Sequence, residues 1–343
     1  MRAVQLASHD QDPSVVEAPT PEAGPGEVRV AMRACGICGS DVHIIEGTTA
    51  PSRLPLVLGH EAAGVVDALG DGVDDLAIGD RVTVNSMISC GECRPCLRGQ
   101  PNFCARLQIM GLHVDGAHSE YFVAPRRNVV SLPDSVDFAL GAIVADAIAT
   151  PMRAIASAGV EPGSTVAVFG LGGLGLHAAM ILKQIYQANV IGVDASDAAL
   201  ERAGGFGVDA VFDARAGRVS DQIKAATGGG VDASFEFVGS VDVVEQALRS
   251  LDYGGVCTVA GVGPDRLRLS VRQETLVARG LRLAGTQGFV TSDIEQLLSW
   301  MDSGRLAIEG TISHQFELDD YVRGLDTLRD RSANAIRVVV TNA

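Results

Sequence analysis

Residues 35–43 (CGICGSDVH) place two cysteines, a serine, an aspartate and a histidine within nine positions. Such a stretch could form a redox cysteine pair, half of a zinc knuckle, or a site that uses only one of its two cysteines. Elsewhere, His60 precedes Glu61 in a Gly-His-Glu triplet, and Asp146 interrupts an apolar stretch. Each of these residues alone would more often be structural. Together, a thiolate from Cys38, an imidazole and a carboxylate would leave zinc one open position for a substrate oxygen, which is typical of a catalytic site.

A second group of cysteines has the spacing of a closed zinc site. Its members are Cys90, Cys93, Cys96 and Cys104. Four thiolates this close can form a tetrahedron around one zinc ion at about 2.3 Å. Coincidental buried cysteines are the weaker alternative, because three evenly spaced thiols in a turn rich in glycine and proline have no packing role. A four-sulfur site has no free position, so we expect this zinc to stabilise a lobe at about residues 88–106 and to take no part in chemistry.

A glycine-rich turn, residues 170–175, follows a predicted strand at 165–169 and opens a predicted helix at 174–187. In this setting Gly170 permits the tight turn, Gly172 lets the backbone approach a pyrophosphate, and Gly175 lets the helix pack closely on the strand. The same motif predicts cofactor contacts from Gly173 and Leu174.

Asp194 ends the next predicted strand, 19 residues after Gly175. A carboxylate there would accept hydrogen bonds from an adenosine ribose and repel a 2′-phosphate. The following residues, 195–197, contain no arginine that could bind such a phosphate. We therefore expect NAD in preference to NADP; the alternative is that Asp194 is a solvated acid at a strand end.

The elements that must position these residues fall into two patterns. The 343 residues are 47% apolar, which is enough for roughly two domains. Short β patterns at 3–7, 27–34, 62–69, 80–84 and 121–124 indicate a small, irregular β domain. From about residue 151, strands alternate with helices, which predicts a doubly wound parallel sheet. Its predicted strands cover residues 165–170, 190–195, 209–214, 231–239, 254–263 and 281–286. The tail has helix patterns at 292–304 and 321–331 and a strand at 335–341, and spacing alone does not assign it to either domain.

Composition excludes several other classes of protein. A net charge of −15 opposes nucleic-acid binding, because no basic stripe is present to neutralise phosphates. The longest apolar stretch, 138–156, is interrupted by Asp146, Pro151 and Arg153, which argues against a membrane span. Seven cysteines, four of them clustered, do not suggest a secreted disulfide framework. The first residues lack the apolar core of a signal peptide, so we expect a cytoplasmic protein.

Four motifs in this order resemble those of the zinc-dependent, medium-chain alcohol dehydrogenase family over essentially the whole chain. They are GICGSD (36–41), LVLGHEAAGVV (56–66), CGECRPCLRGQPNFC (90–104) and VFGLGGLG (168–175). The resemblance implies an α/β plus β fold, in which a GroES-like catalytic domain (1–150 and 289–343) surrounds an inserted Rossmann NAD-binding domain (151–288). It thereby assigns the tail to the first domain.

The resemblance also implies roles for single residues around a catalytic zinc. Cys38 and His60 match the first two ligands, and Asp146 matches the third position. Glu61 matches an acid that approaches the zinc when water or substrate leaves. Cys35 matches no ligand and is expected only to pack.

Three more residues match functional positions of the family. Ser40 matches the hydroxyl that contacts the substrate oxygen, and His43 matches the histidine that passes its proton onward through the cofactor ribose. Arg337 matches a basic residue that reaches the cofactor pyrophosphate; the alternative is a surface arginine. The chain offers no motif around His113, His118, His177 and His314, which we interpret as ordinary polar residues, and Trp300 has the helical spacing of a core residue.

The implied activity is NAD-linked interconversion of an alcohol, with a secondary alcohol favoured, and its ketone or aldehyde. It uses two zinc ions per subunit, one catalytic and one structural. CGICGSDVH is more similar to the sorbitol and threonine branches, whereas the glycine turn and Asp146 favour secondary alcohols. A dinucleotide-binding sensor without activity and a zinc-knuckle nucleic-acid binder are the weaker alternatives. The expected partners are a small-molecule substrate and further copies of the chain, with a tetramer favoured over a dimer and no nucleic acid or membrane.

Overall fold

The computed structural model describes residues 1–9 and 11–342. The chain divides into two compact units. The first comprises Met1–Ala149, Phe289–Ser303 and Glu309 onward, and the second comprises Thr150–Gly288 and Gly304–Ile308. The predicted boundaries at residues 150 and 289 lie within one residue of these. The short segment 304–308 differs from the prediction, because it belongs to the second unit.

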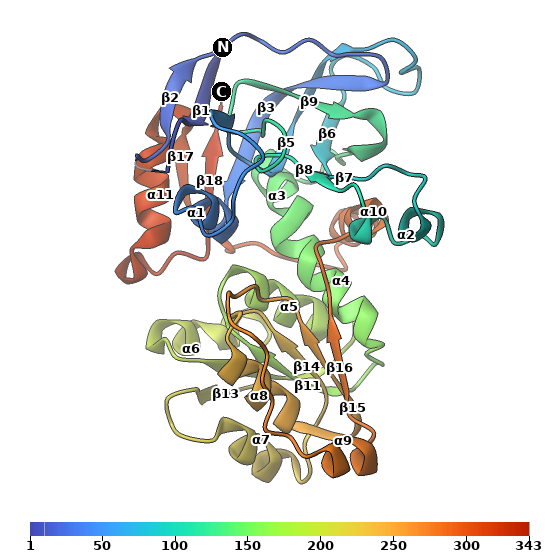
Figure 1. The fold of residues 1–343 in the computed structure, drawn as a ribbon, viewed down its shortest axis with the longest axis vertical. Helices are drawn as coiled ribbons and strands as arrows, with labels where there is room; N and C mark the ends of the chain where they lie inside the picture. The colour runs from blue at the N-terminus through green and yellow to red at the C-terminus, as the bar shows by residue number, and fades with distance from the viewer. Residues whose placement is uncertain (10, 343) are drawn as a thin grey trace. The chain divides into compact units, whose positions relative to one another are not determined.

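The first unit is built on a seven-stranded sheet with the strand order β10-β6-β5-β3-β18-β17, in which β9 also pairs with β3. Its strands are β3 (Glu27–Ile37), β5 (Glu61–Leu69), β6 (Arg81–Val84), β9 (Tyr121–Pro125), β10 (Val129–Ser131), β17 (Ile312–Glu317) and β18 (Arg337–Thr341). Side chains of β3 alternate between partly buried and buried as far as residue 34, as expected for a strand with one face on a core. The C-terminal strand β18 lies antiparallel beside β3 (Figure 1), so the tail completes the first unit.

Smaller elements complete this unit. The additional strands are β1 (Arg2–Leu6), β2 (Ser14–Glu17), β4 (Leu56–Val57), β7 (Met87–Ile88) and β8 (Gln108–Ile109). The helices are α1 (Gly39–Ile45), α2 (Arg94–Leu97), α3 (Phe138–Ile143), α10 (Thr291–Asp302) and α11 (Tyr321–Arg329), and the shorter turns are η1 (Pro101–Phe103), η2 (Arg126–Asn128), η5 (Leu318–Asp320) and η6 (Arg331–Ala333).

A π-helical turn, η3 (Val144–Ile148), joins α3 to α4 (Ala149–Ala158) and carries Asp146. Such turns often occur at functional sites. By length and composition alone, the whole helix Phe138–Ala158 could cross a membrane, although Asp146, Pro151 and Arg153 interrupt its apolar sequence. Since 72% of its apolar window is buried inside the structure, this is weak evidence for a span.

The second unit contains a six-stranded sheet with the order β13-β12-β11-β14-β15-β16, in which every pair is parallel. The strands are β11 (Thr165–Phe169), β12 (Asn189–Asp194), β13 (Ala210–Asp213), β14 (Val231–Glu236), β15 (Leu251–Val259) and β16 (Arg282–Gly285). The helices are α5 (Gly173–Gln184), α6 (Asp197–Ala203), α7 (Val219–Thr227), α8 (Val241–Arg249) and α9 (Gln273–Arg279), with the turn η4 (Gly204–Phe206). This is the strand order of the Rossmann fold, and all six predicted strands form.

Candidate active site

Four potential metal ligands converge in the first unit. Cys38 precedes α1, His60 and Glu61 lie at the start of β5, and Asp146 lies in η3. Each offers one ligand atom, and these atoms all lie within 4.8 Å of one another. Cys38 and Asp146, which are 108 residues apart in the sequence, are therefore brought to one point.

The geometry of this cluster fits a zinc ion. The Cys38 Sγ lies 3.8 Å and the His60 Nε2 lies 3.5 Å from the Asp146 Oδ2. Zinc bonds of about 2.0–2.3 Å place tetrahedral ligands about 3.3–3.7 Å apart. The His60 Nε2 is buried and has no hydrogen-bond partner among the described residues. Since one thiolate, one imidazole and one carboxylate occupy three positions, the fourth would be open to a substrate.

Asp41, which the sequence analysis did not select, supports two of these ligands. Its carboxylate is fully buried. Its Oδ2 accepts the backbone N–H of Cys38 at 2.8 Å, and its Oδ1 lies 3.5 Å from the His60 Nδ1. Burial disfavours the charged carboxylate, but the nearby His60 and His118 outweigh this and hold the pKa of Asp41 below its usual range. A signal was present in the sequence, because an acid three residues after a helix N-cap commonly accepts the N-cap N–H.

His118 is the second residue that the sequence interpretation missed. It is fully buried, its Nε2 lies 3.8 Å from the Asp41 Oδ2, and its ring packs against the edge of Tyr321 at 4.8 Å between centroids. The structure thus places His118 in a buried position beside Asp41, which its sequence context did not indicate. His113, in contrast, accepts the backbone N–H of Ile109 through its Nδ1 at 2.9 Å.

Glu61 and Arg337 form a buried ion pair beside the cluster. Glu61 is fully buried and Arg337 is 3% exposed, and the Arg337 Nη2 donates to the Glu61 Oε2. The alternative of a surface arginine is wrong, and a contact of Arg337 with a pyrophosphate stays a prediction. Burial raises the pKa of Glu61 to about 7, although the positive charge of Arg337 opposes this shift.

Gly36, which lies between the two cysteines of CGICG, leaves room for the Glu61 side chain of the ion pair. Gly36 and Glu61 are opposite each other on β3 and β5. A Cβ atom at Gly36 would lie 2.1 Å from the Glu61 Oε2. The position must therefore be glycine for Glu61 to occupy its place. Cys35, one residue earlier, is fully buried in the apolar core, in agreement with a packing role.

The two residues of the predicted proton path lie on α1. The Ser40 Oγ lies 3.8 Å from the Cys38 Sγ, and both Ser40 and His43 are exposed. The backbone carbonyl of His43 accepts hydrogen bonds from the Thr49 N–H and the Thr48 hydroxyl. Ser40 thus lies next to the four potential metal ligands. Proton transfer through His43 stays a prediction.

The four-cysteine lobe also fits a zinc ion. The Sγ–Sγ distances are 3.4 Å for Cys93–Cys96, 3.8 Å for Cys93–Cys104 and 4.0 Å for Cys90–Cys96. They exceed the disulfide bond length of about 2.05 Å and match the edge of about 3.8 Å in a zinc–thiolate tetrahedron.

Backbone N–H groups stabilise negative charge on these sulfurs. The N–H of Cys90 donates to the Cys104 Sγ at 3.2 Å, and the N–H of Arg106 donates to the same sulfur at 3.3 Å. A hydrogen bond from the backbone N–H of Glu92 is the main cause that lowers the pKa of Cys90 to about 5. Cys90 thus favours the thiolate form that zinc requires, whereas burial raises the pKa of Cys96 to about 11.

The glycine turn in the second unit has the form that a dinucleotide site needs. Gly170 has a φ of 91°, and a Cβ at Gly175 would lie only 1.7 Å from the Gly170 carbonyl oxygen. A Cβ at Gly172 would meet nothing within 4 Å, so space remains for a ligand close to its backbone. The Asp194 Oδ2 accepts the Leu171 N–H at 2.7 Å, which fixes the carboxylate beside this turn.

Residues 195–197 contain no arginine, but arginines from elsewhere in the chain lie at this end of the sheet. The positive charge of Arg202 interacts with Asp194, and its Nη2 donates to the Leu171 carbonyl at 3.5 Å. Arg215, which follows β13, donates from its Nε to the Asp213 Oδ1 at 2.8 Å and pairs with Asp197 through its Nη2. Neither arginine is among the residues that directly follow Asp194 in the sequence. Strand order brings in Arg215, because β13 is the neighbour of β12.

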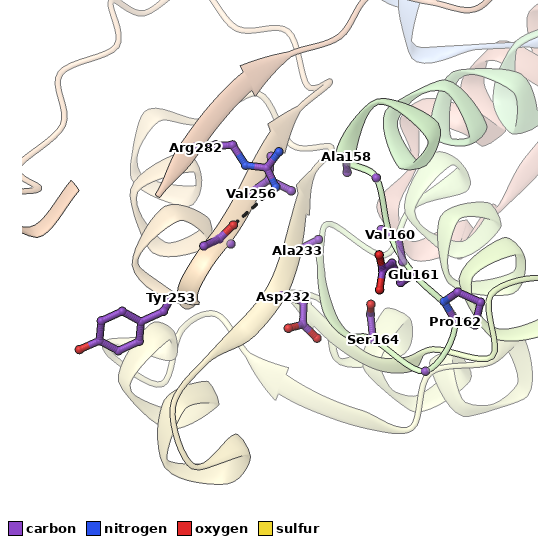
Figure 2. A pocket seen from close by; sticks show the side chains of 14 residues that line it. Ala158, Val160, Glu161, Pro162, Ser164, Asp232, Ala233, Tyr253, Val256 and Arg282 are labelled. Atoms are coloured by element: carbon purple, nitrogen blue, oxygen red, sulfur yellow. Dashed lines mark hydrogen bonds between the residues drawn. The ribbon is translucent and has the colours of Figure 1, made fainter. Parts of the chain in front are cut away.

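A cavity of about 410 Å³ lies elsewhere in the second unit (Figure 2). Its lining includes Ser164, Asp232 and Arg282, which lie at the amino ends of β11, β14 and β16. In Figure 2 the Tyr253 side chain points away from Glu161 and Ser164. Cofactors bind at the carboxyl ends of such sheets, so this cavity is not the dinucleotide site.

A GroES-like unit with an open set of metal ligands, together with a Rossmann unit carrying a dinucleotide turn, defines a medium-chain dehydrogenase. Residues 24–134 match the family model of the alcohol dehydrogenase GroES-like domain, and residues 173–303 match that of the zinc-binding dehydrogenases. An alcohol dehydrogenase from Geobacillus stearothermophilus is 33% identical over 308 residues, covering 89% of this chain and 90% of that protein. The chain therefore belongs to the zinc-dependent medium-chain alcohol dehydrogenase family and is an oxidoreductase.

Three further relatives differ in their substrate or cofactor. An L-threonine 3-dehydrogenase from Pyrococcus horikoshii is 31% identical, covering 96% of this chain and 95% of that protein. A crystal structure described as a short chain alcohol dehydrogenase (rspB) from Escherichia coli CFT073, complexed with NADH, is 27% identical with a TM-score of 0.93, and covers 100% of this chain and 99% of that chain. A protein from Sinorhizobium meliloti 1021, described as a zinc-binding dehydrogenase bound to NADP, is 31% identical with a TM-score of 0.90 and 99% coverage of both chains.

Proposed function

We propose that this protein is a zinc-dependent, NAD-linked oxidoreductase that interconverts a small secondary alcohol and its ketone. The observation that carries the proposal is the convergence of Cys38, His60 and Asp146. These residues supply three ligands of different chemistry and leave the fourth position of a tetrahedral ion for a substrate oxygen.

Each residue around the metal has a distinct task in this proposal. When bound, zinc would act as a Lewis acid that favours loss of the alcohol proton. Ser40, which lies 3.8 Å from the Cys38 Sγ, accepts that proton, and the exposed His43 passes it toward solvent. Asp41 holds the Cys38 backbone and the His60 ring in place. The Glu61 carboxylate, which has one oxygen without a hydrogen-bond partner among the described residues, would be able to hold the metal in place of water or substrate.

The cofactor binds at the turn after β11 in this proposal. Gly172 and Gly173 present backbone N–H groups to the pyrophosphate at the start of α5, and Asp194 accepts hydrogen bonds from the adenosine ribose. NAD, when bound, would accept the hydride from the alcohol carbon. The NADH complex of the rspB structure supports this choice, and the NADP complex of the Sinorhizobium meliloti protein makes the choice worth testing.

The second candidate activity is oxidation of threonine at its secondary hydroxyl. It is favoured by the threonine dehydrogenase that matches nearly the whole chain. The two activities are separated by measuring NADH absorbance with purified protein and equal concentrations of small secondary alcohols, sorbitol and threonine. Highest kcat/KM with a simple secondary alcohol supports the proposal. Highest kcat/KM with threonine or sorbitol replaces it by the corresponding alternative, and no turnover with any of them contradicts it.

A second zinc ion in the four-cysteine lobe and self-association complete the proposal. The lobe would stabilise the fold, because its four sulfurs leave no position for a substrate. We propose a homo-oligomer, with a tetramer favoured by family resemblance, and a cytoplasmic location. Support for self-association comes from β16, which is an edge strand, and from the nearby Val277, which is 72% exposed. Multi-angle light scattering on the purified protein measures the assembly, and a monomer would contradict this part.

A further inference from the structure

Three carboxylates and one arginine lie at the carboxyl ends of β12 and β13. Asp194 and Asp213 are the last residues of these strands and are register partners, while Asp197 is the first residue of α6. The backbone N–H of Ala214 donates to the Asp194 carbonyl at 2.9 Å. Arg215 follows directly, two residues after the register partner of Asp194, so it lies at the same edge of the sheet as the residue proposed to bind the ribose.

The arginine is held by two of the three carboxylates. The Arg215 Nε and Nη2 each donate to Asp213, to Oδ1 and Oδ2 respectively, at 2.8 Å, which is a bidentate pair. The Nη2 also donates to the Asp197 Oδ1. The Arg215 backbone N–H donates to the same Asp213 Oδ1 at 2.8 Å, which fixes the carboxylate in front of the guanidinium.

These contacts occupy the group that could otherwise bind a phosphate. A guanidinium offers a planar set of donors that suits phosphate oxygens as well as carboxylates. Here the positive charge of Arg215 faces the two negative charges of Asp197 and Asp213, so this ion-pair group has a net charge of −1. The positive charge of Arg202 separately interacts with Asp194. A 2′-phosphate would add a charge of about −1.5 to −2 at this edge. It would be repelled, and it would find the Nε and Nη2 donors of Arg215 already used.

We infer that Asp197 and Asp213 are specificity-determining residues that exclude a 2′-phosphorylated cofactor by holding Arg215. The inference rests on the proposed dinucleotide site and deepens it, because it assigns the discrimination to a group of four residues and not to Asp194 alone. Arg215 is a latent phosphate ligand. Its side chain is 52% exposed, and those of Asp197 and Asp213 are 74% and 34% exposed. Such solvated ion pairs are weak, so a phosphate can replace them once the competing charges are removed.

The test compares the binding of NADH and NADPH to four forms of the full chain by fluorescence titration. The forms are wild type, D197N/D213N, D197N/D213N/R215A and D209N/D232N. The Asn substitutions keep the shape of each side chain and remove its charge. The last form removes two charges at the opposite end of the same sheet, where Asp209 accepts the Val190 N–H and Asp232 accepts the Thr165 N–H. Thermal melts of all four show whether they are folded.

The inference predicts that D197N/D213N lowers the ratio of the NADPH Kd to the NADH Kd by about tenfold or more. R215A in that background should restore the ratio, and D209N/D232N should leave it at the wild-type value. An unchanged ratio in D197N/D213N overturns the inference. An equal fall with and without Arg215 also overturns it, because simple charge repulsion would then be the cause. If folded wild type binds neither nucleotide, the proposed dinucleotide site itself is wrong, whereas NADH binding with an unchanged ratio removes only this inference.

Discussion

Replacing Asp41 by asparagine should weaken zinc binding at the cluster of Cys38, His60 and Asp146 while the fold is kept. The Asp41 carboxylate accepts the Cys38 N–H at 2.8 Å and faces the His60 Nδ1 at 3.5 Å, in a fully buried position. Asparagine keeps one acceptor oxygen but loses the charge that favours an Nδ1–H tautomer with Nε2 free for metal. Loss of such a partner typically costs 10–100-fold in metal affinity, or about 1.4–2.7 kcal/mol.

The assay is competition with a chelator of known zinc affinity, followed by metal analysis of the protein. The four-cysteine lobe should keep its zinc and so acts as an internal reference. Tyr321→Phe is the matched control, because the Tyr321 ring packs against His118, and its buried hydroxyl has no hydrogen-bond partner among the described residues. Wild-type zinc affinity in Asp41→Asn, or an equal loss in Tyr321→Phe, would refute the reasoning.

Three further outcomes follow from the structure. Cys93→Ser should release the lobe zinc and lower the melting temperature while a folded protein that binds NADH remains; wild-type zinc content would argue against the lobe site. Gly175→Ala should abolish NADH binding, because its Cβ would lie 1.7 Å from the Gly170 carbonyl oxygen, and wild-type affinity would disprove the close packing. Burial raises the pKa of Cys257 to about 12, so its thiol stays protonated at pH 8. Mass spectrometry should find it unmodified by iodoacetamide in the native protein and modified after unfolding, and rapid native labelling would contradict this.

The sequence predicted the Rossmann unit well because strong local signals agree with each other. All six strands of the parallel sheet were located, since each is a short apolar run followed by a helical segment. The first unit was harder, because its sheet is closed by a strand from the other end of the chain. Pairing of β18 with β3 is a long-range contact that local spacing does not encode. Family resemblance, and not periodicity, predicted it, and the fold class is confirmed.

The candidate metal ligands could be found from the sequence because their residue types are unusual in the segments where they occur. Their supporting residues were not found. His118 is 77 residues from Asp41 in the sequence, and its contact with Asp41 depends on how a loop packs against α1. Arg215 reaches the neighbourhood of Asp194 only because β13 lies beside β12. In both cases the missing information is the packing of distant segments, which residue type and spacing do not specify.

The central claim is that Cys38 helps to hold a zinc ion required for turnover, separate from the ion in the lobe. Metal analysis and alcohol-dependent NADH formation, measured on the same samples of wild type and Cys38→Ser, test it most directly. We expect about two zinc ions per chain and activity in the wild type, against about one zinc ion, no turnover and unchanged NADH affinity in Cys38→Ser. Full activity in the variant, or equal zinc content in both proteins, would contradict the account.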